Sequence, residues 1–433
     1  MSRWALKLLN TRARTAAAYD PSGSIKPNST GGEPRGTHLA RDGDGSLGDI
    51  GSDDDGDDKA DAVIQSLTSQ PTTTNAAKKK NRKKSKKMTS LKQSIPPQVP
   101  LADLFPNGKY PSGEIQPNIS PVDNTARTTA EEVRYESRRR IQDDTWRNNY
   151  HKAAEIHRQV RRWTQASVRQ GQGLTEIAVG IEDGEIFLQA SDVMKVDFGV
   201  HINGWIVDSA FTMSFDPTYD NLLAAVKDAT NTGIKNSGVD VRISDVSAAI
   251  QEAMESYEVE IRGQTFPVKA VRHLAGHNLK PYQIHGEKSI PFVKNKDQTK
   301  MEDGEVFAIE TFGTTGRGSL KDGPGVYGYG KDPYAPKRVM THLALARSLY
   351  KTINDNFGSI VFCRRYLERL GVKRYLAGMN NLASQGVVEV YPPLMDIEGS
   401  YSAQFEHLIL FRLSCWENPA RKLSVVERTT KVY

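Results

Sequence analysis

Two aspartates, Asp197 and Asp208, stand in the otherwise apolar and β-branched stretch KVDFGVHINGWIVDSAF. The Asn203-Gly204 pair between them favours a two-residue hairpin turn, because a type I′ turn needs positive φ at both central positions. Such a turn places Gly199 opposite Asp208, so the two aspartates become diagonal neighbours on one face of the ribbon. Their Cα atoms are then expected to lie about 7–8 Å apart.

Two carboxylates at this separation on an apolar sheet would repel each other and lose hydration. Burial of unpaired charge is strongly unfavourable, so something positive is expected between them. A pair of divalent cations about 3.5–4 Å apart fits that gap. The competing interpretation is an exposed hairpin with two solvated aspartates, and the hairpin alone leaves both interpretations open.

Four further groups of metal-ligand type are embedded in strand-like sequence. His277 lies in AGHNL, His285 in YQIHG, Glu310 at the end of VFAIE and Glu406 in AQFEH. Each alone has a structural interpretation, as a core histidine bonded to backbone or as a carboxylate at a sheet edge. Together, four carboxylates and one or two histidines in apolar strands cannot all be buried without cations. Carboxylates with an imidazole suit a two-metal hydrolytic centre, and the absence of a G-x-S-x-G motif also favours metal over covalent catalysis.

The elements that would carry these groups follow from sequence periodicity. A long helical pattern begins near Thr129, which forms a predicted capping box with Glu132. His157 lies beside the apolar stripe of this helix and is expected to be structural. The stripe residues, which recur at helical spacing and are expected in the core, are Trp146, Tyr150, Ala153, Ile156, Val160 and Trp163.

After the hairpin, two helices are predicted in YDNLLAAVKDATNTGI and SDVSAAIQEAMESYE, separated by the strand-like GVDVRI. Strands and loops follow, and a helical block from MTHLALARSLYKTIN to RYLAGMNNLASQG interrupts them. The predicted fold class is therefore mixed α+β with a helical insertion.

Composition divides the chain into a tail and one large domain. The chain has 433 residues, 37% of them hydrophobic, with a mean hydropathy of −0.55. Residues 1–98 are rich in Gly, Ser, Pro and Thr and are expected to be disordered, and residues 99–433 are expected to fold. Two cysteines indicate a reducing compartment, and no membrane span or secretory signal is apparent.

The tail contains an acidic run, Ser52–Asp58, and a basic run, Lys78–Lys87, with eight positive charges in ten residues. Basic runs bind phosphate backbones without sequence preference, so the basic run is interpreted either as an RNA- or ribosome-docking segment or as a solvated or nuclear-localisation-like tail. The first twenty residues are basic and lack acidic residues before Asp20. They are compatible with a mitochondrial presequence or an ordinary basic tail.

The stretches KVDFGVHINGWIVDSAF, AGHNLKPYQIH, VFAIETFGTTGRG and YSAQFEH, in this order, resemble the type 2 methionine aminopeptidases, a family of pita-bread metallopeptidases (family M24). The resemblance runs from about Val99 to the C-terminus. It implies a pita-bread (creatinase/aminopeptidase-like) fold, with the type 2 helical insertion at about residues 319–388. It also implies cotranslational removal of the initiator methionine, with a preference for a small second residue, by a water that two metals activate.

Residue by residue, the resemblance implies a set of five metal ligands, with Asp208 and Glu406 bridging the metals. Glu310 is also the implied proton shuttle, and His285 the implied substrate-binding residue. Two divalent cations per subunit are implied, and Co, Zn, Mn and Fe all remain open. The partners implied are nascent polypeptide N-termini, with no membrane, in a cytoplasmic monomer. The five ligands are Asp197, Asp208, His277, Glu310 and Glu406.

One departure from the family pattern is apparent. An upstream active-site histidine in an HYTPN-like motif is missing, and an internal segment is absent between Gly184 and Asp192, with the junction at Gly184–Glu185. Loss of such a group costs about 10²–10⁴-fold in rate. Loss of the strands is expected to leave an unpaired sheet edge and to remove a wall of the methionine pocket.

Three interpretations follow from this departure. The chain is an active metalloaminopeptidase, a catalytically impaired pita-bread protein used as a ribosome- or protein-binding module, or an incomplete version of an active enzyme.

Overall fold

The structure of the protein is a computed structural model, which describes residues 4–11, 91–118, 126–179, 187–414 and 423–431. The described residues belong to one compact unit formed by Met1–Ala16 and Ser90–Tyr433. The acidic and basic runs of the tail and the junction at Gly184–Glu185 lie outside the described residues.

The predicted hairpin is present with the predicted register. Strands β3 (Val193–Ile202) and β4 (Trp205–Ser214) pair antiparallel, with Gly199 opposite Asp208. Both turn residues have positive φ, 52° at Asn203 and 86° at Gly204, as a type I′ turn requires. The two aspartates therefore lie diagonally on one face of the ribbon, which confirms the geometric prediction.

The other edge of β3 is paired, contrary to the expectation of an open edge. Strand β1 (Trp4–Thr11) runs antiparallel along β3, from Trp4 opposite Val200 to Thr11 opposite Val193. The expectation of disorder throughout residues 1–98 was therefore wrong for Trp4–Thr11. The backbone N–H and C=O groups of β3 explain the outcome, since an unpaired row of them is a ready template for another strand.

A second, seven-stranded sheet carries the remaining candidate ligands. Its strand order is β2-β16-β15-β10-β8-β9, with β7 paired to β10 beside β8. The long strands β10 and β15 pair antiparallel, with Glu310 opposite Glu406. The bounds are β2 (Glu114–Asn118), β7 (Lys269–Ala270), β8 (Ala275–Asn278), β9 (Ser289–Pro291), β10 (Val306–Thr314), β15 (Ser402–Ser414) and β16 (Leu423–Arg428).

The long N-terminal helical pattern forms two helices, α2 (Thr129–Ile141) and α3 (Asp144–Ser167). The capping box lies one residue earlier than predicted. Thr128, not Thr129, is the N-cap, and its hydroxyl and backbone N–H exchange hydrogen bonds with the residue three positions on, Glu131. The prediction was wrong because Thr128 and Thr129 both stand three residues before a glutamate.

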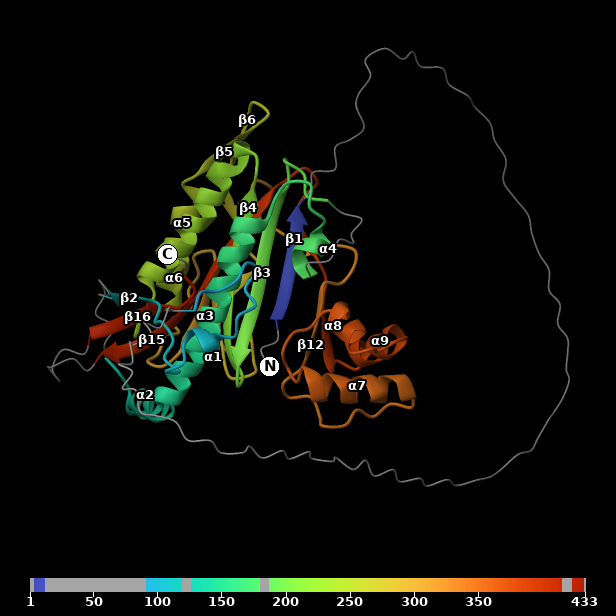
Figure 1. Ribbon diagram of the computed structural model, residues 1–433. Helices are drawn as coiled ribbons and strands as arrows, with labels where there is room; N and C mark the ends of the chain where they lie inside the picture. Colours follow the sequence, from blue (N-terminus) through green and yellow to red (C-terminus); the bar gives the residue numbers. More distant parts are fainter. Residues whose placement is uncertain (1–3, 12–90, 119–125, 180–186, 415–422, 432–433) are drawn as a thin grey trace, which may run out of the picture. The chain divides into compact units, whose positions relative to one another are not determined.

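Helix α3 packs against the hairpin, as Figure 1 shows. Trp146, Tyr150 and Ala153 are buried, and Ile156 and Val160 are partly buried against the same core, as predicted for the stripe. The prediction was wrong for Trp163, which is only partly buried and lines a cavity instead of the core.

Two helices cover the second sheet. Helix α5 (Asp220–Asn236) packs on β10 and β15, and α6 (Ile243–Glu255) packs beside it, towards β7 and β9. The prediction of a strand in GVDVRI was wrong, because only Arg242 forms a bridge there, with Lys300. A 3₁₀ turn (Pro217–Tyr219) precedes α5, and the remaining short elements are α1 (Leu101–Leu104), α4 (Leu174–Val179), β5 (Glu258–Ile261) and β6 (Gln264–Pro267).

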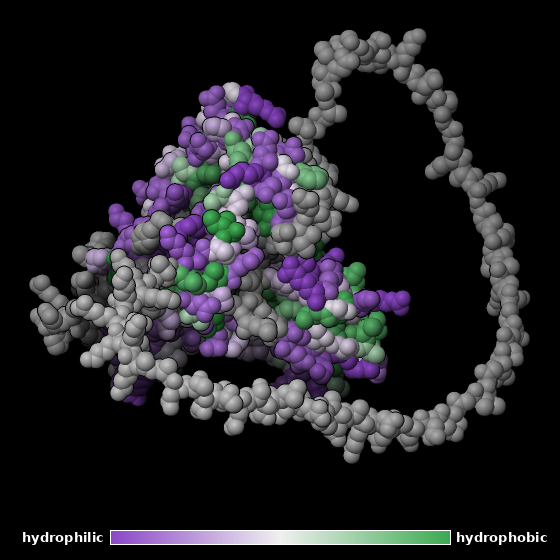
Figure 2. Space-filling view, viewed as in Figure 1, coloured by the Kyte–Doolittle hydropathy of each residue, from purple (hydrophilic) through white to green (hydrophobic). Residues whose placement is uncertain are grey.

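The insertion has a hydrophobic core of its own, which includes Tyr329, Leu349 and Phe362. Its apolar side chains are also exposed in part, among them Met340 and Leu345, and Figure 2 shows apolar surface over this region. The elements are β11 (Lys321–Asp322), β12 (Gly328–Lys331), α7 (Ala344–Asn356), α8 (Arg364–Arg369), α9 (Leu376–Ser384), β13 (Val388–Tyr391) and β14 (Leu394–Met395).

No helix in the described part of the chain combines the length and apolar character that crossing a membrane requires.

The buried His157 couples folding to pH. Its Nε2 lies 3.0 Å from the carbonyl oxygen of Phe198, and its ring stacks on the Phe198 ring at 4.0 Å between centroids. Burial lowers the pKa of His157 from its ordinary 6.5 to about 3, with Arg161 adding to the effect. The imidazole is therefore neutral in the fold at neutral pH, and a structural role holds.

We predict that His157→Phe makes the free energy of unfolding less sensitive to acid. Below pH 6.5 the unfolded chain binds a proton at His157 that the folded chain does not bind until about pH 3, so acidification favours unfolding. In urea unfolding between pH 6.5 and 4, the wild-type free energy of unfolding is expected to fall more steeply than that of the variant, by about 1.4 kcal/mol per pH unit. Parallel curves would contradict the prediction.

Candidate metal centre

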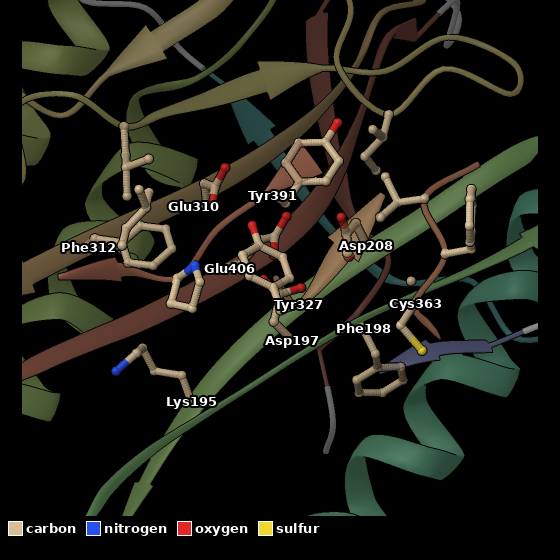
Figure 3. A pocket seen from close by; sticks show the side chains of 18 of the residues that line it. Lys195, Asp197, Phe198, Asp208, Glu310, Phe312, Tyr327, Cys363, Tyr391 and Glu406 are labelled. Atoms are coloured by element: carbon tan, nitrogen blue, oxygen red, sulfur yellow. The ribbon is translucent and has the colours of Figure 1, made fainter. Parts of the chain in front are cut away.

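Three carboxylates from two different sheets meet in one place. Ligand oxygens of Asp197, Asp208 and Glu406 all lie within 4.8 Å of one another. Figure 3 shows them converging from the hairpin and from β15. Glu406 is 2% exposed, and the two aspartates are half-buried. The two aspartates share one face of the hairpin, as its register predicted, and Glu406 lies beside them.

Strand β10 brings Glu310 to the same wall. Because Glu310 is directly opposite Glu406 in the ladder, both side chains lie on one face of the sheet. His277 on β8 is opposite Ala308, which places it diagonally beside Glu310 on that face. Like charges directly opposite each other destabilise a ladder. Glu310 and Glu406 therefore destabilise the pairing of β10 with β15, and the fold alone gives no reason for both to be there.

His277 has the state that a metal ligand needs. Its Nε2 lies 3.7 Å from Oε1 of Glu310, and its Nδ1 is buried without a hydrogen-bond partner among the described residues. Burial, with the neighbouring His285 adding to it, lowers the pKa of His277 to about 3. The imidazole is therefore neutral at neutral pH, with a lone pair available for a cation.

His285 lies on the loop after β8, and its ring centroid is 4.6 Å from that of His277, nearly perpendicular to it. The hairpin tip and the insertion hold this loop. The Tyr282 N–H donates to the carbonyl of Gly204 at 2.9 Å, and the Ser359 hydroxyl donates to the carbonyl of Tyr282. Gly204 suits this contact because an added Cβ would collide with the Tyr282 ring.

All six predicted site residues line one cavity of about 1640 Å³. Its apolar wall includes Ile284 and Phe312, and the insertion contributes Tyr327, Tyr391 and Cys363 (Figure 3). A cavity with an apolar wall and a few convergent polar groups is the usual form of a binding site for a small molecule or peptide end.

Three polar residues around the site were missed by the sequence reasoning. Lys195 is 4% exposed, and its ammonium donates to the backbone and hydroxyl oxygens of Ser402 at 3.2 Å. Gln404 is fully buried, and its side-chain amide donates to two of the predicted ligands, Asp197 and Glu310. Both could have been found from strand alternation, because Lys195 precedes Asp197 and Gln404 precedes Glu406 by two residues.

The third is Arg161 on α3, which is 4% exposed behind the hairpin. Its guanidinium donates to the Ser209 hydroxyl and to the Ala210 carbonyl (3.2 Å), and it lies over the Phe211 ring. Burial lowers the pKa of Arg161 to about 9, while the negative charge of Glu406 opposes that shift. Arg161 therefore places a buried positive charge on the opposite face of the hairpin from Asp208, where it still interacts with the charge of Glu406.

The histidines upstream of Asp197 that the structure describes do not join the cluster. Nε2 of His151 lies 2.8 Å from Oε1 of Glu427, and His157 is bonded to the Phe198 carbonyl. His201 borders the cavity near the hairpin tip, where its Nδ1 accepts from the Gly204 N–H at 3.3 Å. None of these three histidines belongs to the cluster of Asp197, Asp208 and Glu406.

The residues present fit divalent cations. Four carboxylates and a neutral imidazole line one cavity, and the His277 side chain is buried. Oxygen ligands with one imidazole suit Mn, Fe, Co or Zn. Cations bound in the cavity would offset the repulsion between Glu310 and Glu406, which stand directly opposite each other in the ladder.

Comparison with known proteins places this arrangement in a family. The chain matches the metallopeptidase family M24 over residues 172–332. It is 66% identical to methionine aminopeptidase 2-2 of Aspergillus flavus, over 93% of this chain and 96% of the relative. It is 64% identical to methionine aminopeptidase 2-1 of Penicillium rubens, over 92% of this chain and 95% of the relative.

Among solved structures, a thermophilic Arx1 superposes with a TM-score of 0.50 at 12% identity, over 67% of this chain and 89% of that one. This likeness concerns the fold alone.

The alignment with the Aspergillus flavus relative bears on the absent segment. It extends over 449 residues, which exceeds the 433 residues of the chain. The relative therefore has residues without a counterpart here, as the prediction of an absent segment requires. Its position between Gly184 and Asp192 stays a prediction. With two thirds of its aligned residues shared with a methionine aminopeptidase 2 along nearly its whole length, the chain belongs to the type 2 methionine aminopeptidase family of the pita-bread M24 metallopeptidases.

Proposed function

We propose that this protein is a metal-dependent methionyl aminopeptidase, which removes the initiator methionine from nascent proteins and prefers a small second residue. The observation that carries the proposal is the convergence of Asp197, Asp208 and Glu406 from two sheets within 4.8 Å. The identity of 66% with a methionine aminopeptidase supports the same reaction.

In this proposal the cations are held by Asp197, Asp208, His277, Glu310 and Glu406. Divalent cations, when bound, supply Lewis acidity that acidifies water and polarises the scissile carbonyl. These four carboxylates and one imidazole would suit a pair of divalent cations.

The protein's own groups then carry the proton and orient the peptide. Glu310 takes a proton from the attacking water and delivers it to the leaving amine, as a carboxylate within reach of both can. His285 contacts the substrate near the scissile bond, since its ring is beside His277 at the cavity wall. The apolar side chains of Ile284 and Phe312 are suited to the methionine side chain.

The same proposal extends to the partners and to the cell compartment. Nascent chain ends are the substrates of a cytoplasmic monomer, and the basic run Lys78–Lys87 docks the protein on ribosomal RNA. The eight positive charges in this run support docking by charge, because each neutralised phosphate releases counterions.

A binding module without catalysis is the alternative, based on the absent upstream histidine. High identity to methionine aminopeptidases favours the enzyme.

We predict that Asp208→Asn abolishes metal-dependent release of methionine from a Met-Ala-Ser peptide. Loss of a ligand is expected to lower kcat/KM by more than the 10–100-fold typical of an outer-shell change. A chelator is expected to abolish wild-type activity, and added Mn, Co, Zn or Fe to restore it. The matched control is Asp355→Asn, an exposed aspartate of α7 that pairs with Lys351. Wild-type protein inactive with every one of these metals would support the binding module.

We predict that ribosome binding depends on salt through the basic run. Replacing four lysines of Lys78–Lys87 by glutamine is expected to weaken co-sedimentation and to flatten its dependence on salt concentration. Replacing Asp53, Asp54 and Asp55 by asparagine is expected to strengthen binding, because the acidic run competes for the same charges. Co-sedimentation that is unchanged in both variants would exclude this role of the tail.

A further inference from the structure

Gln404 occupies the seam where the hairpin meets the second sheet. It lies on β15 opposite Phe312 and two residues before Glu406, so its side chain shares the face of Glu310 and Glu406. The residue is fully buried. A buried glutamine on this face needs an explanation, because an apolar residue would pack there without any demand for hydrogen bonds.

The backbone of Gln404 is anchored to the hairpin by one hydroxyl. Thr212 of β4 donates from Oγ1 to the Gln404 carbonyl at 2.8 Å, and the Gln404 N–H donates to the same Oγ1 at 2.8 Å. The Thr212 hydroxyl thus links β4 to β15 in place of backbone-to-backbone hydrogen bonds. These two bonds fix the position of the Gln404 backbone relative to the hairpin.

The side chain of Gln404 bridges ligands of the two sheets. Its Nε2 donates to Oδ2 of Asp197 at 3.1 Å and to Oε2 of Glu310 at 3.4 Å. Because both partners are carboxylates, the NH₂ group and not the amide oxygen must face them. A single amide therefore supplies a donor to one proposed ligand of the hairpin and to one of β10.

The amide oxygen of Gln404 gains no hydrogen bond from this arrangement. Oε1 of Gln404 is buried and has no hydrogen-bond partner among the described residues. A buried acceptor without a partner is destabilising. Gln404 therefore satisfies the two carboxylates at the expense of its own oxygen, which is the pattern of a residue retained for a site and not for stability.

We propose that Gln404 is a positioning residue that holds Asp197 and Glu310 at ligating separation before the cations bind. The inference rests on the proposed function, since it concerns the same carboxylates. Two carboxylates from separate sheets otherwise repel and turn away from each other, and the bridging amide offsets part of that repulsion. Cations then meet ligands that are already oriented, and less ordering is needed on binding.

The test is a calorimetric titration of the metal-free protein with Mn or Co, which measures the metal dissociation constant. Gln404→Met keeps the length of the side chain and removes both donors. It is expected to weaken metal binding by about 10–100-fold, with kcat at saturating metal changed much less than the metal dissociation constant. If this variant does not fold, Gln404→Asn serves instead, because its shorter amide cannot reach both carboxylates, and the same loss is expected.

The matched control is Thr230→Val, which removes a buried hydroxyl of α5 that donates to the Phe405 carbonyl on the same strand, β15. Thr230 makes no hydrogen bond to a proposed ligand. Its variant is expected to lower the unfolding temperature without changing metal affinity. Equal losses of affinity in both variants, or affinity within twofold of wild type for Gln404→Met, would overturn the proposal.

The outcome also separates this inference from the proposed function. Normal metal binding by wild-type protein without release of methionine removes the aminopeptidase proposal and leaves the role of Gln404 intact. Wild-type protein that binds no divalent metal overturns both.

Discussion

Repulsion between carboxylates on one wall of a cavity is the constraint around which the described structure is arranged. Glu310 and Glu406 stand directly opposite each other in a ladder, and the hairpin adds Asp197 and Asp208 to the same space. A sheet with this wall is unfavourable unless positive charge or hydrogen-bond donors reach it. The surrounding residues meet that demand from three directions. Arg161 supplies a buried cation behind the hairpin, Gln404 donates across the seam, and the cavity side remains for cations.

The same constraint explains which parts of the structure were predictable from the sequence. The hairpin register follows from Asn203-Gly204, because a two-residue turn leaves no freedom in pairing. The buried stripe of α3 follows from helical spacing. The capping box was misplaced by one residue, because adjacent threonines offer equal local signals and only the packing of the helix decides between them. Local propensity fails for two segments. GVDVRI has strand-like residues but forms only one bridge, at Arg242. Trp4–Thr11 lies in a segment expected to be disordered but pairs with β3 as a strand.

The candidate site divides along similar lines. Its ligand types could be recognised one by one, since carboxylates in apolar strands are conspicuous. The hydrogen-bond partners of these ligands could not be predicted. Gln404 and Lys195 form their hydrogen bonds between β15 and β3, which lie about two hundred residues apart in sequence. No local pattern encodes which residue of β15 meets which residue of β3. Strand alternation would have placed both side chains on the face of the ligands, but the identity of their partners depends on how the two sheets meet.

The departure from the family pattern concerns the substrate side of the cavity more than the metal ligands. All five proposed ligands lie after the predicted junction at Gly184–Glu185, on strands whose pairing register the structure describes. The ligand geometry is set by the hairpin turn, by the β10–β15 ladder and by the seam through Thr212 and Gln404. None of these contacts involves the segment before β3. Strand β1 also pairs with the edge of β3 that the absent strands would leave open. The predicted absence of a segment before Asp192 would therefore act on the substrate side of the cavity, where the family pattern has an upstream histidine and a pocket wall. The metal side depends on other strands, so we expect metal binding to be separable from peptide turnover.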